Sequence, residues 1–534
     1  MSWVTTAVLL VAVSVPLPAQ QLVWERIGVK ESYRLGRWMA AIGDINGDGY
    51  EDLVNAVDVR PGRCGTQLWF FSGKDGKTLR VRSWYAGDRP YERLAAAGDA
   101  NRDGVADYAV TVGDCSMLNR DKIVEIRSGK DDRLIWQVSG PWNDAFGYAI
   151  LGDLDLDGDR KPDLVVSAER EKDAGAVHAY ANGGKLLYKL VGKYPGKYYF
   201  GFSLGKVGDV DKDGKDDFVL GANEPTRRGM AVLVSGATGR TLVTGYGERP
   251  YDHLGFKVAG AGDIDGDGVP DFVAGSSGGF MTRARVRAFS GKTGKVIFQW
   301  TDTTGFALPG RGIDMDRDGV PDIVVGTPGE VTVRSGRDGS TILRVSNRTT
   351  GIGYFVAALR PQPGSPFGLF AAGEPAYGPG NIRPTYLGRI RVYRASPPGV
   401  QVYGATCKGT LETSPRIGIR DLQGKGARIH LSDAAPGSPA LLLLGLSRTK
   451  WGTIPLPLAL DPLGFSGCKL QTSIELLFGA STGTTRNAKG YAFFDVPLPL
   501  ASGKGSFTLH GQWISFGSGP TWPGALSDPM LWRH

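Results

Sequence analysis

The sequence is poor in the residues that build nitrogen- and sulfur-ligated metal sites. It has only four cysteines in 534 residues, and no CxxC pair or Cys/His cluster occurs. Structural zinc sites depend on such clusters, so the chain is not expected to bind zinc. Its five histidines show no metal-ligand spacing and are scattered along the chain at His178, His253, His430, His510 and His534.

Long apolar runs are also scarce. Beyond the first twenty residues the longest is Ala440 to Leu446, which is too short to cross a bilayer. Residues 3–17 are apolar apart from two threonines and a serine, and the first charge is Glu25. We interpret residues 1–20 as a secretory signal peptide, with a buried N-terminal helix or an uncleaved anchor as the alternative. The processed protein is therefore expected to be secreted or at the cell surface, with no membrane span.

Glycine and proline, by contrast, are abundant. There are 79 glycines and 32 prolines, together about a fifth of the chain, while hydrophobic residues make up 41%. The absence of a Gly-X-Y period excludes a collagen-like rod, and the apolar content excludes a disordered chain. A folded protein with many turns remains, which favours β structure.

One acidic segment recurs along the chain. The copies are GDINGDGYEDLV at 43–54, GDANRDGVADYAV at 98–110, DLDGDRKPDLVV at 155–166, GDVDKDGKDDFVL at 208–220, GDIDGDGVPDFVA at 262–274 and IDMDRDGVPDIVV at 313–325. The spacings are 55, 56, 54, 54 and 51 residues when they are measured between Asp44, Asp99, Asp155, Asp209, Asp263 and Asp314. A period this regular indicates a repeat architecture.

A second element keeps the same phase. FFSGKDGKTLRV, LVSGATGRTLVT and related segments place two short β-rich runs around a glycine-containing turn, which is typical of a hairpin. Each period thus holds four short strands, as in a propeller blade. Residues 353–375 keep this framework without the aspartates and form a seventh blade, which lacks its fourth strand. Residues 21–27, QLVWERI, resemble the outer hairpin strands and are predicted to supply it.

The sequence therefore predicts an all-β chain in three parts. Residues 1–20 are the signal peptide, residues 21–398 a seven-bladed β-propeller with calcium-binding loops, and residues 399–534 a small, β-sandwich-like C-terminal domain.

The acidic segments have the composition of calcium loops. Oxygen-bearing side chains fall at positions 1, 3, 5 and 9, position 7 adds a backbone carbonyl, and a set of six to eight oxygens suits Ca²⁺. Simple turns are the alternative, but they do not require three or four carboxylates at fixed offsets. We expect up to six structural Ca²⁺ ions. The expected ligands are Asp44, Asn46, Asp48, Tyr50 and Asp52; Asp99, Asn101, Asp103, Val105 and Asp107; Asp155, Asp157, Asp159, Lys161 and Asp163; Asp209, Asp211, Asp213, Lys215 and Asp217; Asp263, Asp265, Asp267, Val269 and Asp271; and Asp314, Asp316, Asp318, Val320 and Asp322.

The third of these loops departs most from the pattern. Arg160 stands where the other loops have a glycine at position 6, and Asp153 offers a competing register. It is therefore the least certain of the six.

The combined pattern, an FG pair before each GD-x-D-x-DG-x-x-D loop and a GAP-like end, resembles the FG-GAP repeat of the integrin α-subunit headpiece. It is also similar to repeats of many secreted bacterial proteins, and we place this chain with that bacterial secreted type. The resemblance covers about 380 residues. It implies a seven-bladed propeller with calcium-binding loops, and it does not imply a partner.

Four cysteines fit an oxidising compartment. Cys64 and Cys115 lie 20 and 16 residues beyond corresponding repeat positions, while Cys407 and Cys468 both fall in the C-terminal region. We expect disulfides 64–115 and 407–468, with free thiols as the alternative.

No catalytic constellation stands out. Residues 275–279 fit GxSxG, but a nucleophile elbow needs a following helix, and β-rich sequence follows here. A binding or adhesion module for extracellular carbohydrate or a surface protein is therefore expected, acting as a monomer. An extracellular polysaccharide lyase or hydrolase built on the propeller is the alternative. The net charge of +8 suits an acidic polymer, but no basic-aromatic stripe indicates nucleic acid.

Overall fold

The computed structural model describes most of the chain from residue 21 onward. In its first part it describes residues 21–395 except 29–33, 59–65, 85–87, 115–120, 194–198, 224–227, 279–282, 302–305, 348–350, 361–366 and 376–386. In its second part it describes residues 400–402, 416–421, 427–434, 439–445, 450–451, 454–456, 458–459, 469–472, 474, 476–482, 491–496, 508–515, 525–527 and 530–533.

Strands dominate these residues, with a single short 3₁₀ turn at Glu171–Asp173. Seven sheets in the described first part have four antiparallel strands each, and we call them blades 1 to 7. From the innermost strand outward they are β2 (Trp38–Gly43), β3 (Asp52–Asp58), β4 (Thr66–Phe71) and β5 (Thr78–Trp84); β6 (Asp88–Ala96), β7 (Tyr108–Asp114), β8 (Lys122–Arg127) and β9 (Leu134–Gly140); β10 (Phe146–Leu154), β11 (Asp163–Ala168), β12 (Ala176–Tyr180) and β13 (Leu186–Val191); β14 (Tyr199–Gly208), β15 (Asp217–Asn223), β16 (Met230–Val234) and β17 (Thr241–Tyr246); β18 (Leu254–Gly262), β19 (Asp271–Ser276), β20 (Arg285–Phe289) and β21 (Val296–Thr301); β22 (Leu308–Pro309), β23 (Ile323–Thr327), β24 (Glu330–Arg334) and β25 (Thr341–Ser346); and β26 (Phe355–Leu359), β27 (Leu369–Glu374), β28 (Arg389–Arg394) and β1 (Gln21–Ile27).

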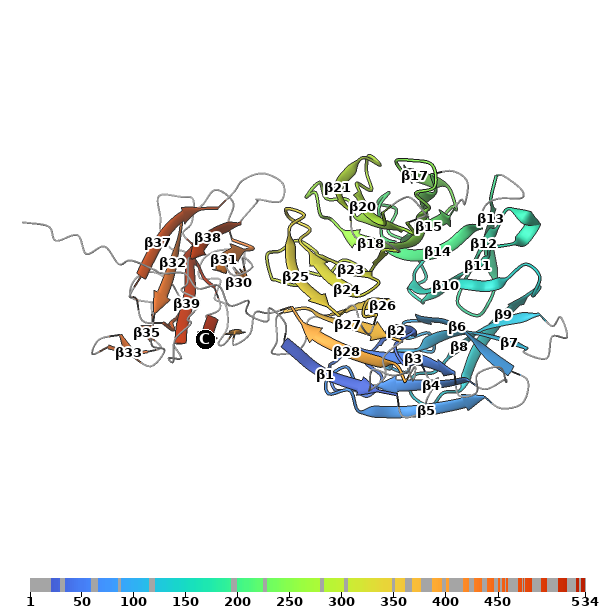
Figure 1. Cartoon of the computed structure of the whole chain (residues 1–534), viewed down its shortest axis with the longest axis horizontal. Coiled ribbons are helices and arrows are strands. Elements are labelled where there is room, and N and C mark those ends of the chain that lie inside the picture. Colours follow the sequence, from blue (N-terminus) through green and yellow to red (C-terminus); the bar gives the residue numbers. More distant parts are fainter. Residues whose placement is uncertain are drawn as a thin grey trace, which may run out of the picture.

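The blades form a ring (Figure 1). Successive innermost strands contact one another from β2 through β6, β10, β14, β18 and β22 to β26, and β26 contacts β2 again. Every residue of the second strands β11, β15 and β19 is buried, because both faces of a blade pack against neighbouring blades. These strands consequently read as continuous apolar runs and not as an alternating pattern.

The ring closes through the N-terminal strand, as the sequence predicted. Strand β1 pairs antiparallel with β28 and becomes the outer strand of blade 7. Trp24 of this strand is buried, and its indole Nε1 donates to the carbonyl of Gly73 in blade 1, at 2.9 Å. The blade that ends the repeat is thus fastened to the blade that begins it.

The second part of the chain holds two sheets that share one core. One sheet orders as β29 (Val400–Val402), β41 (Met530–Arg533), β39 (Thr508–Ser515), β32 (Pro439–Gly445) and β37 (Leu476–Ser481), with β40 (Ala525–Leu526) beside β39. The other is β30 (Arg416–Asp421), β31 (Ala427–Ser432) and β38 (Ala492–Val496). Two small pairs are β33 (Lys450–Trp451) with β34 (Ile454–Pro455), and β35 (Leu458–Ala459) with β36 (Lys469–Leu470).

Buried Ile429, Leu442 and Trp513 belong to the core between these two sheets. The all-β fold class is confirmed. The domain limits remain a prediction, because residues 1–20 and 396–399 lie outside the described residues. Within the described part, none of the helical structure is long or apolar enough to cross a membrane.

Candidate metal centres

Each acidic loop joins the first and second strands of blades 1 to 6, and we call these loops 1 to 6. The aspartate at position 1 folds the loop around its own side chain. In loop 5 the Asp263 carboxylate accepts backbone N–H groups from Gly266 at 2.7 Å, Asp267 at 3.1 Å and Gly268 at 2.9 Å. Gly266 and Gly268 both have positive φ, which turns successive N–H groups toward one point.

The aspartate at position 9 closes the loop from the other side. Asp271 is fully buried, and its two oxygens accept separate backbone bonds from Ile264 at 2.8 Å and Gly291 at 2.9 Å. Gly291 belongs to the turn between the third and fourth strands of the same blade. The carboxylate therefore joins three segments: the loop, the second strand and the outer hairpin.

The same pair of hydrogen bonds to the position-9 aspartate recurs in all six loops, with N···O distances of 2.7–3.1 Å. The pairs of donors are Ile45 and Gly73 for Asp52, Ala100 and Gly129 for Asp107, Leu156 and Asn182 for Asp163, Val210 and Gly236 for Asp217, Ile264 and Gly291 for Asp271, and Met315 and Gly336 for Asp322.

Sequence reasoning missed this role of the hairpin turn. In five of the six blades this turn carries a serine-glycine pair in the same phase as the loops, with Ala181-Asn182 in its place in blade 3. That shared phase was the available signal.

Carboxylates gather in four of the loops. In loops 3 to 6 the side chains at positions 1, 3 and 9 offer oxygens that lie within 4.8 Å of one another, in the groups Asp155, Asp157 and Asp163; Asp209, Asp211 and Asp217; Asp263, Asp265 and Asp271; and Asp314, Asp316 and Asp322. Such clusters could hold a metal ion, and oxygen-only ligands favour a hard cation.

Burial makes the closing carboxylates hard to ionise without a cation. It raises the pKa of Asp52 and Asp271 to about 7, and that of Asp163 and Asp217 to about 6, although backbone N–H bonds act in the opposite direction. Other carboxylates in each loop add to the rise in pKa. A bound cation would relieve both effects, since it favours the charged form.

Loops 1 and 2 carry asparagine at position 3. Asn46 donates from Nδ2 to Asp48 at 3.1 Å, and Asn101 donates to Asp103 at 3.2 Å. These amides neutralise part of the repulsion between neighbouring oxygens without adding charge. Both loops retain the position-1 and position-9 backbone bonds, so their shape matches that of loops 3 to 6.

Loop 3 adopts the common shape despite its altered sequence. Arg160, at the position of the usual glycine, has φ of +60°, and its N–H bonds to Asp155 at 3.0 Å. Gly268 makes the equivalent bond to Asp263 in loop 5. In addition, Lys161 pairs with Asp159 at 3.0 Å and lowers its pKa. Arg160 thus takes the backbone conformation that glycine has in the other loops, and the group of Asp155, Asp157 and Asp163 still forms.

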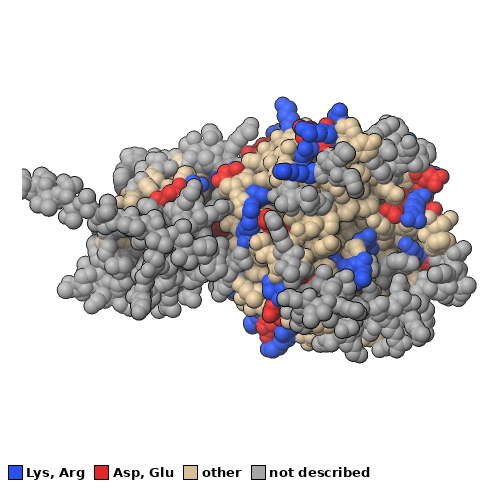
Figure 2. Space-filling model, in the orientation of Figure 1, with Lys and Arg blue, Asp and Glu red and all other residues tan. Residues whose placement is uncertain are grey.

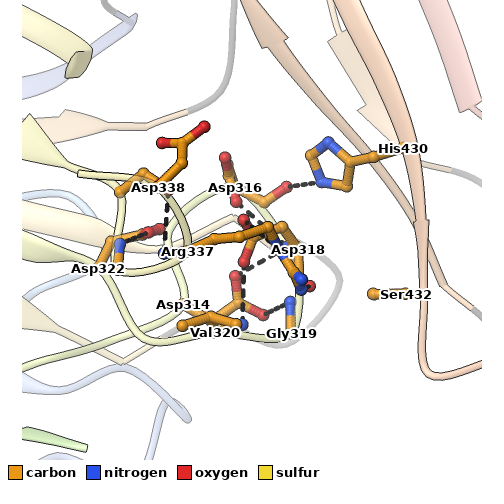
Figure 3. Close-up of polar contacts among 12 residues, drawn as sticks. Asp314, Asp316, Asp318, Gly319, Val320, Asp322, Arg337, Asp338, His430 and Ser432 are labelled. Atoms are coloured by element: carbon orange, nitrogen blue, oxygen red, sulfur yellow. Dashed lines mark hydrogen bonds and ion pairs between the residues drawn. The ribbon is translucent and has the colours of Figure 1, made fainter. Parts of the chain in front are cut away.

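Loop 6 differs because the C-terminal domain packs on it (Figure 3). His430 Nε2 donates to the carbonyl of Asp316 at 3.0 Å, and Ser432 Oγ donates to the carbonyl of Arg317 at 2.8 Å. Arg317 in turn donates to the carbonyl of Ile417 at 3.0 Å. Loop 6 is thus hydrogen-bonded to β31 through its backbone carbonyls and to β30 through the Arg317 side chain.

Arginines also neutralise this loop. Arg337 donates from Nε to Asp318 at 3.1 Å and lies 3.6 Å from the ring centre of Tyr491, so it contacts both parts of the chain. Arg416 approaches Asp314 at 4.0 Å. Arg337 therefore competes with a metal ion for the position-5 carboxylate, and loop 6 serves as an interdomain contact.

The four cysteines fall outside the described residues, so the predicted disulfides stay predictions. The same holds for the signal peptide. The GxSxG segment begins at Gly275 in β19, and its central serine, Ser277, forms an antiparallel bridge with Phe306 and is not among the residues that line the cavity between the innermost strands.

Fold and loops together define a class: a closed β-propeller whose blades carry an aspartate loop between their first and second strands. Comparison with known proteins agrees. The FG-GAP repeat family matches residues 146–180, which cover β10 to β12 and loop 3. The chain thus carries an FG-GAP repeat at these residues and is integrin α-like in sequence.

Integrin chains are among its relatives. It is 30% identical over 231 residues to integrin alpha-5 of Xenopus laevis, 28% over 206 residues to integrin alpha-V of Gallus gallus, and 30% over 235 residues to integrin alpha-PS2 of Drosophila melanogaster. These matches cover 34–38% of this chain but only 16–21% of the relatives. The likeness thus concerns the propeller and does not extend to the activities of whole integrins.

Proposed function

We propose that the chain is an exported calcium-binding propeller that acts as a binding or adhesion module for extracellular carbohydrate or a surface protein. The observation that carries the proposal is the set of carboxylate clusters in loops 3 to 6, each closed by a buried aspartate that accepts a backbone N–H from the hairpin turn of its own blade. The integrin-like propeller supports a binding role over a catalytic one.

Calcium fits these groups better than other biological cations. The ligands are carboxylate oxygens, with an amide oxygen at position 3 in loops 1 and 2, and the loops supply no nitrogen or sulfur. Ca²⁺ accepts six to eight oxygens in variable geometry, whereas Mg²⁺ demands a near-ideal octahedron. The ion's role is structural: it offsets repulsion among carboxylates that already join three segments of a blade.

Metal binding is tested by titrating Ca²⁺ and Mg²⁺ into chelator-treated protein, with isothermal calorimetry and elemental analysis of the bound ion. Selective uptake of Ca²⁺, together with a higher melting temperature, supports the structural role. A melting temperature that chelator does not change would refute the structural role of calcium in the loops.

The binding role is tested on a glycan array and by capture of candidate surface proteins, in calcium and in chelator. Calcium-dependent binding to acidic glycans supports a carbohydrate partner. Figure 2 shows basic and acidic side chains mixed over the described surface of one face, so a polyanion would meet dispersed charges there. A failure to bind any glycan, with melting still calcium-dependent, removes the carbohydrate hypothesis and leaves the metal role intact.

Export, the disulfides 64–115 and 407–468, and a monomeric state belong to the same proposal. They are checked on protein recovered from the culture medium. N-terminal sequencing should place cleavage near residue 20, non-reducing peptide mapping should recover both pairs, and light scattering should give the mass of one chain.

A further inference from the structure

An axial cavity of about 350 Å³ lies where the innermost strands of the seven blades meet. Every blade contributes to its lining, through Trp38, Arg93, Tyr148, Phe202, Phe256, Phe306 and Tyr354 among others. Gly201 and Gly255, with φ of +84° and +90°, immediately precede two of these aromatic residues, and the turn directs the rings inward. The cavity opens to solvent at Tyr354, which is 42% exposed.

These side chains contact one another around the cavity. Ring centres are 5.1 Å apart for Tyr148 and Phe202, 5.3 Å for Phe202 and Phe256, 6.1 Å for Phe256 and Phe306, and 5.1 Å for Phe306 and Tyr354. The aromatic wall is therefore continuous across five blades. Distances of this size allow the rings to support one another and to offer flat apolar surface to a ligand.

Arg93 of blade 2 lies between aromatic rings of the two neighbouring blades. Its guanidinium carbon lies 4.6 Å from the ring centre of Trp38 and 4.5 Å from that of Tyr148, which closes the circle between blades 1 and 3. Stacking between two aromatic faces holds the guanidinium in place. A positive charge is thereby built into the wall of the cavity.

Arg37, beside β2, adds a second positive charge to the lining, and Lys257 of β18 adds a third. Among the described residues no carboxylate pairs with Lys257, and the described lining of the cavity contains no aspartate, glutamate or histidine. Burial, helped by the nearby Arg93, lowers the pKa of Lys257 to about 8. Glu169 lies in a smaller recess that shares Arg93 and Tyr148, and it balances part of the charge of Arg93. The charge of Lys257 has no such compensation.

We propose that this cavity binds a small anionic ligand with a flat apolar body, of the aromatic carboxylate class. The carboxylate would bind Lys257 and Arg93, and the ring would lie against Phe202, Phe256 and Phe306. A cationic ligand is disfavoured, since it would meet the positive charges of Arg37, Arg93 and Lys257 in a site whose described lining lacks a carboxylate. The described lining also lacks the carboxylate pair that most glycoside hydrolases use, which favours binding over glycoside hydrolysis.

The test uses three probes of nearly equal shape: phenylacetate, phenylacetamide and phenethylamine. Calorimetric titration of the full chain at pH 7 should show binding of phenylacetate, about tenfold weaker binding of the amide, and no binding of the amine. Because Trp38 lines the cavity, a change in tryptophan emission provides an independent readout.

Two variants test whether Lys257 and Arg93 bind the carboxylate of the ligand. Lys257→Gln and Arg93→Gln should each weaken phenylacetate binding about tenfold or more, with far less effect on the amide. Lys295→Gln, an exposed lysine on the same blade, is the matched control and should bind like the parent protein. Circular dichroism and melting curves verify that each variant is folded, and the second variant keeps the test valid if the first does not fold.

Equal affinity for the three probes, tighter binding of the amine, or unchanged affinity in both variants would overturn the proposal. Failure of phenylacetate to bind at millimolar concentration would do the same. None of these outcomes bears on calcium binding, because the loops and the cavity share no residue.

Discussion

The closing aspartate and the position-3 aspartate of one loop should respond differently to the same substitution. Asp271 accepts backbone N–H groups on both oxygens, from Ile264 and Asp265 on one and from Gly291 on the other. Asp265 accepts the N–H of Asp267 at 3.1 Å. An asparagine has one acceptor oxygen and one NH₂ group. At position 265 the amide oxygen can still accept the N–H of Asp267, but at position 271 at least one buried N–H must face an NH₂ group.

The magnitudes follow from these contacts. In chelator, Asp271→Asn should lower the free energy of unfolding by about 2 kcal/mol, because one bond is lost and one buried donor is left unsatisfied. Relief of the buried charge offsets part of a larger loss, since burial raises the pKa of Asp271 to about 7. Asp265→Asn should change stability in chelator by no more than about 0.5 kcal/mol.

Calcium should then separate the two effects. At a concentration 100 times its dissociation constant, one bound ion contributes about 2.7 kcal/mol, and both variants should lose much of this increment. Urea unfolding followed by circular dichroism, with and without chelator, gives all four differences. Equal destabilisation by the two variants in chelator would refute the separate bonding role of Asp271, and an Asp265→Asn variant with full calcium stabilisation would refute its role as a ligand.

Three further predictions concern other parts of the propeller. Trp24→Ala should lower the free energy of unfolding by about 3 to 5 kcal/mol, because it removes a buried ring and its bond to Gly73; urea unfolding checks this, and a loss below 1 kcal/mol would contradict the closure. Glu374→Gln should lower the free energy of unfolding by about 3 kcal/mol, because the buried Arg389 would lose the carboxylate that lies 2.5 Å from it. A free energy of unfolding equal to that of the parent would contradict this role of Glu374. The pKa of Lys257 is about 8 in the folded state and near 10.5 in the unfolded state. Between these values the unfolded state binds more protons, so the free energy of unfolding should rise with pH from about 8 to 10.5. The melting temperature of the parent should therefore rise relative to that of Lys257→Met over this pH range, and a difference between the two that does not change with pH would disprove the assignment.

The sequence by itself determined the repeated unit. Four strands per period, the aspartate loop between the first two and the closure by residues 21–27 follow from local patterns, because strand alternation, glycine turns and carboxylate spacing are fixed within about fifteen residues. Even the altered loop 3 keeps this shape, since Arg160 adopts the positive φ that glycine has elsewhere.

Only the tertiary structure decided what the repeats do to one another. The bond from Asp271 to Gly291 spans twenty residues, and the bond from His430 to the carbonyl of Asp316 spans 114. The axial cavity is lined by side chains from the innermost strands of all seven blades and from the residues beside them. Such contacts depend on how blades are rotated about the axis and on where the C-terminal sheets pack. No local pattern encodes these relations, because packing of the whole ring fixes them.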